Sequence, residues 1–309
     1  GVPASDLQSW TPGHIAVHVS AEDAWGNAVA AEHPIELDLN AVAVTVDVIS
    51  GDDRLNAAEK GSDLTLSGQT QGVEAGQTVV VKFADRTYTA QVQQDGSWSL
   101  TVPASAMETL IDGRAQVSVS VTNVNGNSAD ASRVVTVDTL PPDITINNLT
   151  DDNIISAAEA QQDIVLSGSS TAEAGQTVTV ALNGKTYQTT VQHDGSWQLT
   201  VPAADVGALA DGTVTVTATV SDVAGNGSST DRVGLVDATV PQVTINDFVT
   251  DTNTINQLAH TQAQVLSGSV TGAAAGDWVT VTINNVDYTT VVDAAGHWGL
   301  GLPASVGQG

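Results

Sequence analysis

The chain lacks cysteine and carries little positive charge. Because none of its 309 residues is a cysteine, disulfide bridges and cysteine-ligated zinc sites are excluded. Eight lysines and arginines stand against 35 aspartates and glutamates, for a net charge of -27, which argues against nucleic acid or an anionic membrane as a partner. No apolar run approaches the roughly 20 residues that a membrane-spanning helix needs. The sequence therefore predicts neither nucleic-acid binding nor membrane insertion.

A unit of about 100 residues, the size of a small domain, recurs along the chain. The stretch from Thr45 to Asp138 reappears from Thr145 to Asp237, and it begins a third time at Thr244. Self-similarity at a fixed period is typical of proteins built as arrays of like modules. The function is therefore to be sought in what an array of domains performs.

The two ends of the chain carry incomplete copies of this unit. Residues 1–43 align with its closing half and residues 242–309 with its opening half, on either side of complete modules at 44–142 and 143–241. An isolated half leaves an apolar sheet face in water, at a cost of about 25 cal/mol per Å². Two interpretations stay open: the chain is an excerpt from a longer array, or the halves complete one another within or between chains by strand complementation.

The second complete module shows the expected secondary structure most clearly. Segments such as VTVTATVS alternate strictly with period two, and Asn183-Gly184 and Asp194-Gly195 are hairpin turn signals. We expect seven strands, at Ile144–Asn147, Ile164–Ser167, Thr177–Leu182, Thr186–Gln192, Trp197–Val201, Val214–Ser221 and Arg232–Val236. A short helical turn is expected at Ser156–Gln161. Seven short strands in a domain of this size predict an all-β fold of tandem immunoglobulin-like β-sandwich modules in a linear rod.

Aspartate dominates the acidic residues, with 27 Asp against 8 Glu. Strands disfavour aspartate, so the excess belongs in turns and loops, where short carboxylates are also the ligands that Ca²⁺ prefers. Because successive strands run in opposite directions, the loops alternate between the two ends of a sandwich, and we expect many of these aspartates to gather where modules meet. The candidate metal ligands are Asp38, Asp52, Asp53, Asp95, Asp112, Asp138, Asp151, Asp152, Asp194, Asp211, Asp222 and Asp237.

The alternative is that these aspartates are ordinary turn residues and that their charge serves solubility. The register is also imperfect, because Asn123 stands where the next copy has Asp222, and Ala295 stands where it has Asp194. Junctions with such replacements are expected to bind Ca²⁺ more weakly or with other ligands. Crowded carboxylates repel one another, and a bound Ca²⁺ that takes 6 to 8 oxygens, roughly 2.3 to 2.6 Å away, removes that penalty.

The chain also resembles the bacterial immunoglobulin-like repeats of giant non-fimbrial adhesins. The resemblance covers the whole chain and rests on the DGSW-LTVPA run at Asp95–Ala104 and Asp194–Ala203, on DVAGN at Asp222–Asn226 and on the linker Val236–Pro241. It implies a secreted or cell-surface rod exported by type I secretion, with Ca²⁺ near the interfaces of adjacent modules and a spacer role in attachment to host cells or in biofilm. A host-cell glycan or receptor is the external partner that the resemblance implies.

Two other functions are weighed against a spacer. The six histidines do not recur in register, and neither a Ser-His-acid trio nor a phosphate-cradling glycine loop repeats, so we expect no enzyme activity. Trp98, Trp197 and Trp298 recur at one position, where they belong to the sandwich core or a junction contact or, in a lectin-like module that binds a glycan, form stacking surfaces. Trp10, Trp25 and Trp278 do not repeat, so a ligand site peculiar to one copy is to be sought there.

Overall fold

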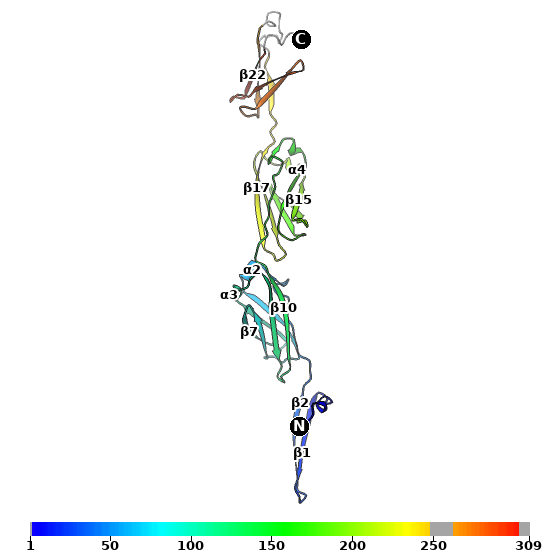
Figure 1. Ribbon diagram of the computed structural model, residues 1–309. Coiled ribbons are helices and arrows are strands. Elements are labelled where there is room, and N and C mark those ends of the chain that lie inside the picture. The colour runs from blue at the N-terminus through cyan, green and yellow to red at the C-terminus, as the bar shows by residue number, and fades with distance from the viewer. Residues whose placement is uncertain (1, 248–261, 303–309) are drawn as a thin grey trace. The chain divides into compact units, whose positions relative to one another are not determined.

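The computed structural model describes residues 2–247 and 262–302 (Figure 1). The chain divides into two compact units, which are described separately. The first unit comprises Gly1–Asp143 together with two later segments, Thr171–Gln176 and Val220–Ser228. The second comprises Ile144–Ser170, Thr177–Thr219 and Ser229–Gly309. Among the described residues, none of the helices has the length and apolar character that a membrane crossing needs.

The first unit opens with a helical turn, α1 (Ala4–Leu7), and a long hairpin, β1 (Gly13–Glu22) and β2 (Ala28–Leu37). The two strands pair antiparallel from Gly13 opposite Leu37 to Glu22 opposite Ala28. Trp25 lies in the turn between them and is 81% exposed. The hairpin leads through Asp38 into the first complete sandwich.

The first sandwich consists of two sheets. One has the order β4 (Arg54–Leu55), β10 (Ser128–Val137), β9 (Gly113–Thr122), β6 (Thr78–Phe83) and β7 (Arg86–Gln91), and the other consists of β3 (Ala43–Val44), β5 (Leu64–Gln71) and β8 (Ser97–Val102). Two short helices, α2 (Ala57–Lys60) and α3 (Ala104–Met107), lie in the connections. Alternating valines such as Val79, Val81, Val117 and Val119 point inward and are almost completely buried, which is the period-two pattern expected from the sequence.

The tryptophan that recurs in each module is a core residue. Trp98 is 1% exposed, and its indole N–H donates to the carbonyl of Thr45 at 3.1 Å. Gly68 lies opposite Trp98 in the register, where an added Cβ would come within 1.9 Å of that same carbonyl. Trp197 and Trp298 are equally buried, at 1% and 3% exposure. The core interpretation is therefore confirmed, and these rings have no free face on which a sugar could stack.

The second unit contains a sandwich of the same kind. Its larger sheet has the order β11 (Ile154–Ser156), β17 (Gly227–Asp237), β16 (Gly212–Ser221), β13 (Thr177–Leu182) and β14 (Lys185–Thr190), and β12 (Ile164–Ser169) pairs with β15 (Ser196–Val201). A 3-10 turn, η1 (Glu159–Gln161), and a helical turn, α4 (Ala203–Val206), complete it. The β-sandwich predicted from the sequence is thus confirmed.

Some details of the second sandwich differ from the expectation. The predicted first strand is reduced to an isolated bridge between Ile144 and Ser170. The short strand β11, parallel to β17, and the turn α4 were not anticipated, because three or four residues are too few to show a periodicity. The last strand begins at Gly227 and not at Arg232, because its first residues, Gly227–Asp231, are small or polar and lack the apolar alternation that marks the rest of the strand.

Beyond its complete sandwich, the described residues of the second unit form a further, smaller group of strands. β18 (Gln242–Ile245), β19 (Gln264–Thr271) and β22 (His297–Leu302) form one sheet, and β20 (Trp278–Ile283) pairs with β21 (Val286–Val291). Leu266, Val292 and Trp298 belong to its small apolar core. Trp278, in contrast, is 74% exposed.

Candidate functional site

One loop geometry occurs twice in the chain, and one of its two instances is the loop Asp222–Asn226, which follows β16. Asp222 is buried, with only 8% of the residue exposed. Its Oδ1 accepts the backbone N–H groups of Ala224 at 2.9 Å and Asn226 at 2.8 Å, and its Oδ2 accepts the Asn226 amide at 2.9 Å. Both carboxylate oxygens therefore accept hydrogen bonds from the loop to which Asp222 belongs. Asp23 holds the loop between β1 and β2 with the same three bonds.

Asn226 connects this loop to the linker within the first unit. Its amide donates to the backbone carbonyl of Asp138 at 2.9 Å, and its Oδ1 accepts the N–H of Ala57 at 3.0 Å. The Asn56 amide in turn donates to the carbonyl of Ala224 at 3.0 Å. Neither asparagine was among the candidates from the sequence, although Asn27, Asn127 and Asn226 close the corresponding loop in three places and could have signalled the role of Asn226.

The linker residue Asp138 lies beside Asp112. Gly113 pairs with Val137 at the end of the β9–β10 ladder, so Asp112 and Asp138 occupy the next pair of positions on the two strands. The Asp112 Oδ1 accepts the Thr139 N–H at 3.1 Å and its hydroxyl at 2.8 Å, and the Asp138 Oδ1 accepts the Leu140 N–H at 3.3 Å. In the described part of the chain, the second oxygen of each carboxylate has no hydrogen-bond donor.

The second unit repeats this arrangement at the end of its complete sandwich. The Asp211 carboxylate accepts the Ala238 N–H at 2.8 Å and the Thr239 hydroxyl. Hydrogen bonds from Thr239 and then Ala238 lower the pKa of Asp211. Asp237, the last residue of β17, is exposed, and its carboxylate forms no hydrogen bond or ion pair with any described residue. Both complete modules therefore end in an aspartate pair whose hydrogen-bonding capacity is not fully used by the described residues.

The linker before the first sandwich is different. The Asp38 Oδ2 accepts the side-chain amides of Asn125 at 2.7 Å and Asn123 at 3.2 Å, and its Oδ1 accepts the Asn40 N–H at 2.8 Å. The hydrogen bond from Asn125 is the largest cause of a lowered pKa at Asp38. Here neutral amide groups satisfy the carboxylate.

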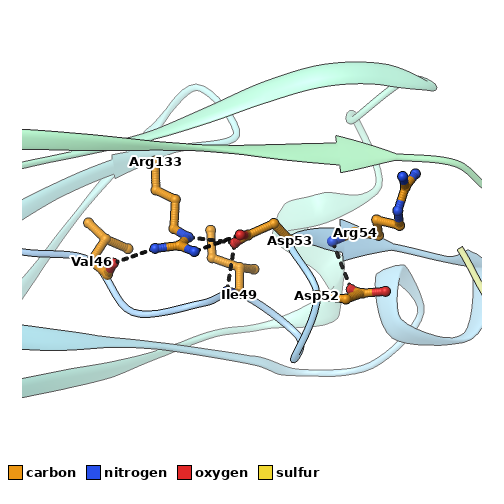
Figure 2. A network of polar contacts seen from close by, with 6 residues as sticks. All are labelled: Val46, Ile49, Asp52, Asp53, Arg54 and Arg133. Carbon is orange, nitrogen blue, oxygen red and sulfur yellow. Dashed lines mark hydrogen bonds and ion pairs between the residues drawn. The ribbon is translucent and has the colours of Figure 1, made fainter.

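Figure 2 shows Asp52 and Asp53 in the connection before β4. The Arg133 guanidinium of β10 binds both oxygens of Asp53, with Nη2 at 2.6 Å from Oδ2, and donates to the Val46 carbonyl at 3.1 Å. The hydrogen bonds from Arg133 and Ile49 lower the pKa of Asp53. Asp53 is therefore already neutralised and does not fit the role of a metal ligand.

The remaining candidates are turn residues. Asp95 and Asp194 each accept the backbone N–H and hydroxyl of the serine two residues on, which lowers the pKa of both carboxyls. Asp52 accepts the Arg54 N–H at 2.9 Å. Asp152 accepts the Ile154 N–H at 2.9 Å, and this bond is the main reason for its lowered pKa. The neighbouring Asp151 makes no side-chain hydrogen bond within the described ranges. These are the bonds that aspartate forms in ordinary turns.

The donor set fits Ca²⁺ in part. Across residues 2–247 and 262–302, no three His, Cys, Asp or Glu side chains gather closely enough to hold a metal ion. Ca²⁺ also accepts carbonyl oxygens and water, so fewer than three carboxylates can contribute to a site. In the pairs Asp112 with Asp138 and Asp211 with Asp237 at least one carboxylate oxygen has no donor among the described residues, whereas both oxygens of Asp53 and of Asp222 accept hydrogen bonds.

Comparison with known proteins gives the family. The bacterial Ig-like domain family matches residues 37–139 and 147–240. The chain is 32% identical to a Ca²⁺-stabilized adhesin that helps an Antarctic bacterium bind ice, over 95% of this chain and 74% of that one, with a TM-score of 0.44. It is 30% identical, with the same coverages and a TM-score of 0.34, to a tetra-tandem repeat in the extending region of a large adhesion protein.

A single bacterial immunoglobulin-like domain from the M. primoryensis ice-binding adhesin is also 32% identical, over 31% of this chain and 95% of that domain, with a TM-score of 0.25. A search of curated protein sequences finds no match. The family match covers most of both complete modules and agrees with the resemblance found in the sequence. The chain therefore belongs to the bacterial immunoglobulin-like domain family, as a tandem array of its modules.

Proposed function

We propose that this chain is a spacer segment of a bacterial surface adhesin, in which Ca²⁺ at the ends of the complete modules stiffens the array. The array holds a distal binding region away from the cell for attachment to host cells or in biofilm. The protein is secreted to the bacterial surface, and its immediate partners are the adjacent modules of the same chain. This role is structural and needs no catalysis.

The recurrence of one aspartate pair at both module ends carries the proposal. Asp112 and Asp138 are replaced in the next module by Asp211 and Asp237, and in both pairs the first carboxylate accepts the backbone N–H just after the second aspartate. A chain with net charge -27 gains from a bound cation wherever such carboxylates stand side by side. The relatives described as Ca²⁺-stabilized and as an extending region support the same role.

The expected energy is small but sufficient to bias a joint. Extracellular modules bind Ca²⁺ with dissociation constants of about 10⁻⁴ to 10⁻³ M. At about 1 mM Ca²⁺ each site then stabilises the bound arrangement by about 0.4 to 1.4 kcal/mol. That is enough to shift the distribution of joint angles and too little to decide whether a sandwich folds.

Small-angle X-ray scattering of the whole chain, in 1 mM Ca²⁺ and in excess EGTA, tests this function. We expect chelation to broaden the distance distribution and lower the mean dimension, while far-UV circular dichroism stays constant because each sandwich remains folded. The double variant Asp138→Asn with Asp237→Asn should scatter like the chelated protein even in Ca²⁺. Asp130→Asn, which removes one charge from the exposed face of β10, should respond to Ca²⁺ as the unaltered chain does. Identical scattering with and without Ca²⁺ would overturn the proposal.

A further inference from the structure

The first complete sandwich carries an open groove of about 700 Å³ near one end of its larger sheet. The turn between β6 and β7, the segment Thr109–Ile111 and the start of β9 border it. Lys82, Arg86 and Arg114 contribute three cationic side chains to its walls, and Gln116 and Ser118 contribute polar ones. The volume falls within the range of about 300 to 1,000 Å³ typical of ligand pockets.

The three cations have no partner within the part of the chain that the structure describes. Among the residues that the structure describes, Lys82, Arg86 and Arg114 form no ion pair and no side-chain hydrogen bond, whereas Arg133 and Lys185 are both paired with aspartates. The whole chain has only eight lysines and arginines against 35 acids. Three unpaired cations around one groove are therefore a local reversal of the charge that dominates the molecule.

The second sandwich shows why Arg86 is unpaired. There Lys185, at the equivalent first position of β14, pairs with Asp205 of α4, and the Tyr187 hydroxyl donates to the same carboxylate at 2.7 Å. In the first sandwich α3 has Ala106 where α4 has Asp205. Arg86 thereby loses its carboxylate, and the buried hydroxyl of Tyr88 is left without a hydrogen-bond partner.

The neighbouring positions have changed in the same direction. The places of Lys82 and Arg114 are taken by Ala181 and Thr213 in the second sandwich, so only the first sandwich has the cationic groove. The turn beside it is also unusual, since Ala84 and Asp85 both have positive φ angles, of 50° and 56°. The other two copies have Asn183 and Asn284 at the position of Ala84, and asparagine tolerates a positive φ better than alanine. Strained backbone of this kind often accompanies a binding site.

We propose that the first complete module binds a short acidic saccharide in this groove. Guanidinium and ammonium groups recognise carboxylate and sulfate groups through charge-assisted hydrogen bonds. Thr109, Gln116 and Ser118 supply hydroxyl and amide groups to pair with sugar hydroxyls. An acidic peptide is disfavoured because it would need an enclosed apolar pocket for an anchoring side chain. The apolar Ile111 that lines the groove is itself 83% exposed. The ligand is short because the remaining negative charge of the chain repels a long polyanion.

Isothermal titration calorimetry of the whole chain tests the proposal with four probes of similar length. These are a heparin-derived hexasaccharide, a hexagalacturonate, neutral maltohexaose and hexaglutamate. We expect one or both acidic saccharides to bind and the two others to bind at least about tenfold more weakly. Absence of acidic-saccharide binding, equal binding of maltohexaose, or tighter binding of hexaglutamate would each overturn the proposal.

Variants locate the site. Arg86→Ala and Arg114→Thr should each weaken acidic-saccharide binding about tenfold, because each removes one charge-assisted contact. Lys185→Ala, which removes a cation of the second sandwich, is the matched control and should leave affinity unchanged. Asp85→Asn removes the one carboxylate that borders the groove and keeps a residue that tolerates the turn, so it should tighten binding about twofold to threefold. An equal loss with Lys185→Ala would show that only net charge matters and would refute the site.

Ala106→Asp adds an independent readout. It restores the carboxylate of the second sandwich, so Arg86 should become paired and saccharide binding should fall about as far as in Arg86→Ala. Unchanged binding in a folded Ala106→Asp protein would contradict the role of Arg86. Because Ala106 is buried, its folding is checked first by circular dichroism, and Arg86→Ala carries the test if the protein does not fold.

Discussion

Asp38 and Asp138 occupy the same place in successive linkers, yet their surroundings differ in chemistry. The Asp38 carboxylate is surrounded by amide groups of the loop after β9, with the Asn125 amide at 2.7 Å. Asp138 accepts the Asn226 amide with its backbone carbonyl, and one of its carboxylate oxygens has no donor among the described residues. The difference teaches that a linker aspartate can be satisfied either by neutral donors of the protein or, as we propose, by a cation from solution.

The cause of the difference lies in three substitutions between copies. Pro12 stands before β1 where Asp112 stands before β9, so the first linker has no second carboxylate. Asn123 and Asn125 stand where the later loop has Asp222 and Ala224, so only the loop after β9 presents two extra amides to its linker aspartate. The carboxylate of one linker is therefore satisfied by amide groups, and the next linker brings two carboxylates together, as the proposed Ca²⁺ site requires.

The largest effect is expected where Asp222 holds its loop. Replacing Asp222 with Ala removes three hydrogen bonds from a nearly buried loop and should lower the free energy of unfolding of the second sandwich by about 2 to 3 kcal/mol. Asp222→Asn keeps an oxygen for the two backbone N–H groups, as Asn123 does in the first sandwich, and should cost less than about 1 kcal/mol.

Hydrogen exchange of the β12 and β15 amides measures this stability for the second sandwich separately. A loss in Asp222→Asn as large as in Asp222→Ala would show that the negative charge of Asp222 matters more than its hydrogen bonds. Asp222 would then regain its place among the metal-ligand candidates, and the comparison of the two linkers would have to include it.

The next effect concerns Ca²⁺ and depends on the proposed function. In Asp138→Asn the Ca²⁺-dependent gain in stability at the linker, about 0.4 to 1.4 kcal/mol at millimolar Ca²⁺, should disappear, because the paired carboxylate is lost. In Asp38→Asn the response to Ca²⁺ should be unchanged. Calorimetric titration with Ca²⁺ measures both, as the number of sites and their affinity. If Asp38→Asn abolishes a site and Asp138→Asn does not, the roles assigned to the two linkers are reversed.

Much of the fold was predictable because short-range sequence patterns, namely strand alternation and turn residues, determine it. Alternating residues such as those of Val214–Ser221 and turns such as Asn183-Gly184 predicted the strands and their connections. Of the interpretations open for the repeated tryptophan, the structure confirms the core position. The parallel strand β11 escaped because three residues carry no period, and its pairing depends on a strand about 80 residues later in the chain.

The candidate site was less predictable, because sequence does not reveal where a carboxylate points. Asp53, Asp138 and Asp222 are all loop aspartates in the sequence, but their contacts differ. The Arg133 guanidinium binds the Asp53 carboxylate, the Asp138 carboxylate accepts the Leu140 N–H, and the Asp222 carboxylate accepts donors of its own loop. The metal ligands therefore stay a prediction, which the structure narrows to two pairs. The cationic groove could not be predicted either. That Arg86 is unpaired follows from Ala106 standing where the second sandwich has Asp205, and this role of Asp205 is visible only from its contacts with Lys185 and Tyr187.

The smallest effect tests the hydrogen-bonded linker through its pKa. The Asn125 amide lowers the pKa of Asp38 below its ordinary value of 3.8. Because the folded pKa is depressed, the contribution of Asp38 to stability is fully present above about pH 3.8 and is lost as the pH falls through the lower folded value. This linker should therefore be insensitive to EGTA and should loosen only in strong acid.

NMR titration of the Asp38 carboxyl measures the shift directly. Asn125→Ala should raise the pKa of Asp38 toward 3.8, whereas Asn127→Ala, whose amide lies farther away at 3.4 Å, should change it less. A pKa that moves equally in the two variants would mean that the general field of the loop, and not a specific amide, satisfies Asp38. A pKa of Asp38 that changes on addition of Ca²⁺ would remove the distinction between the linkers altogether, since Asp38 and Asp138 would then both bind the cation.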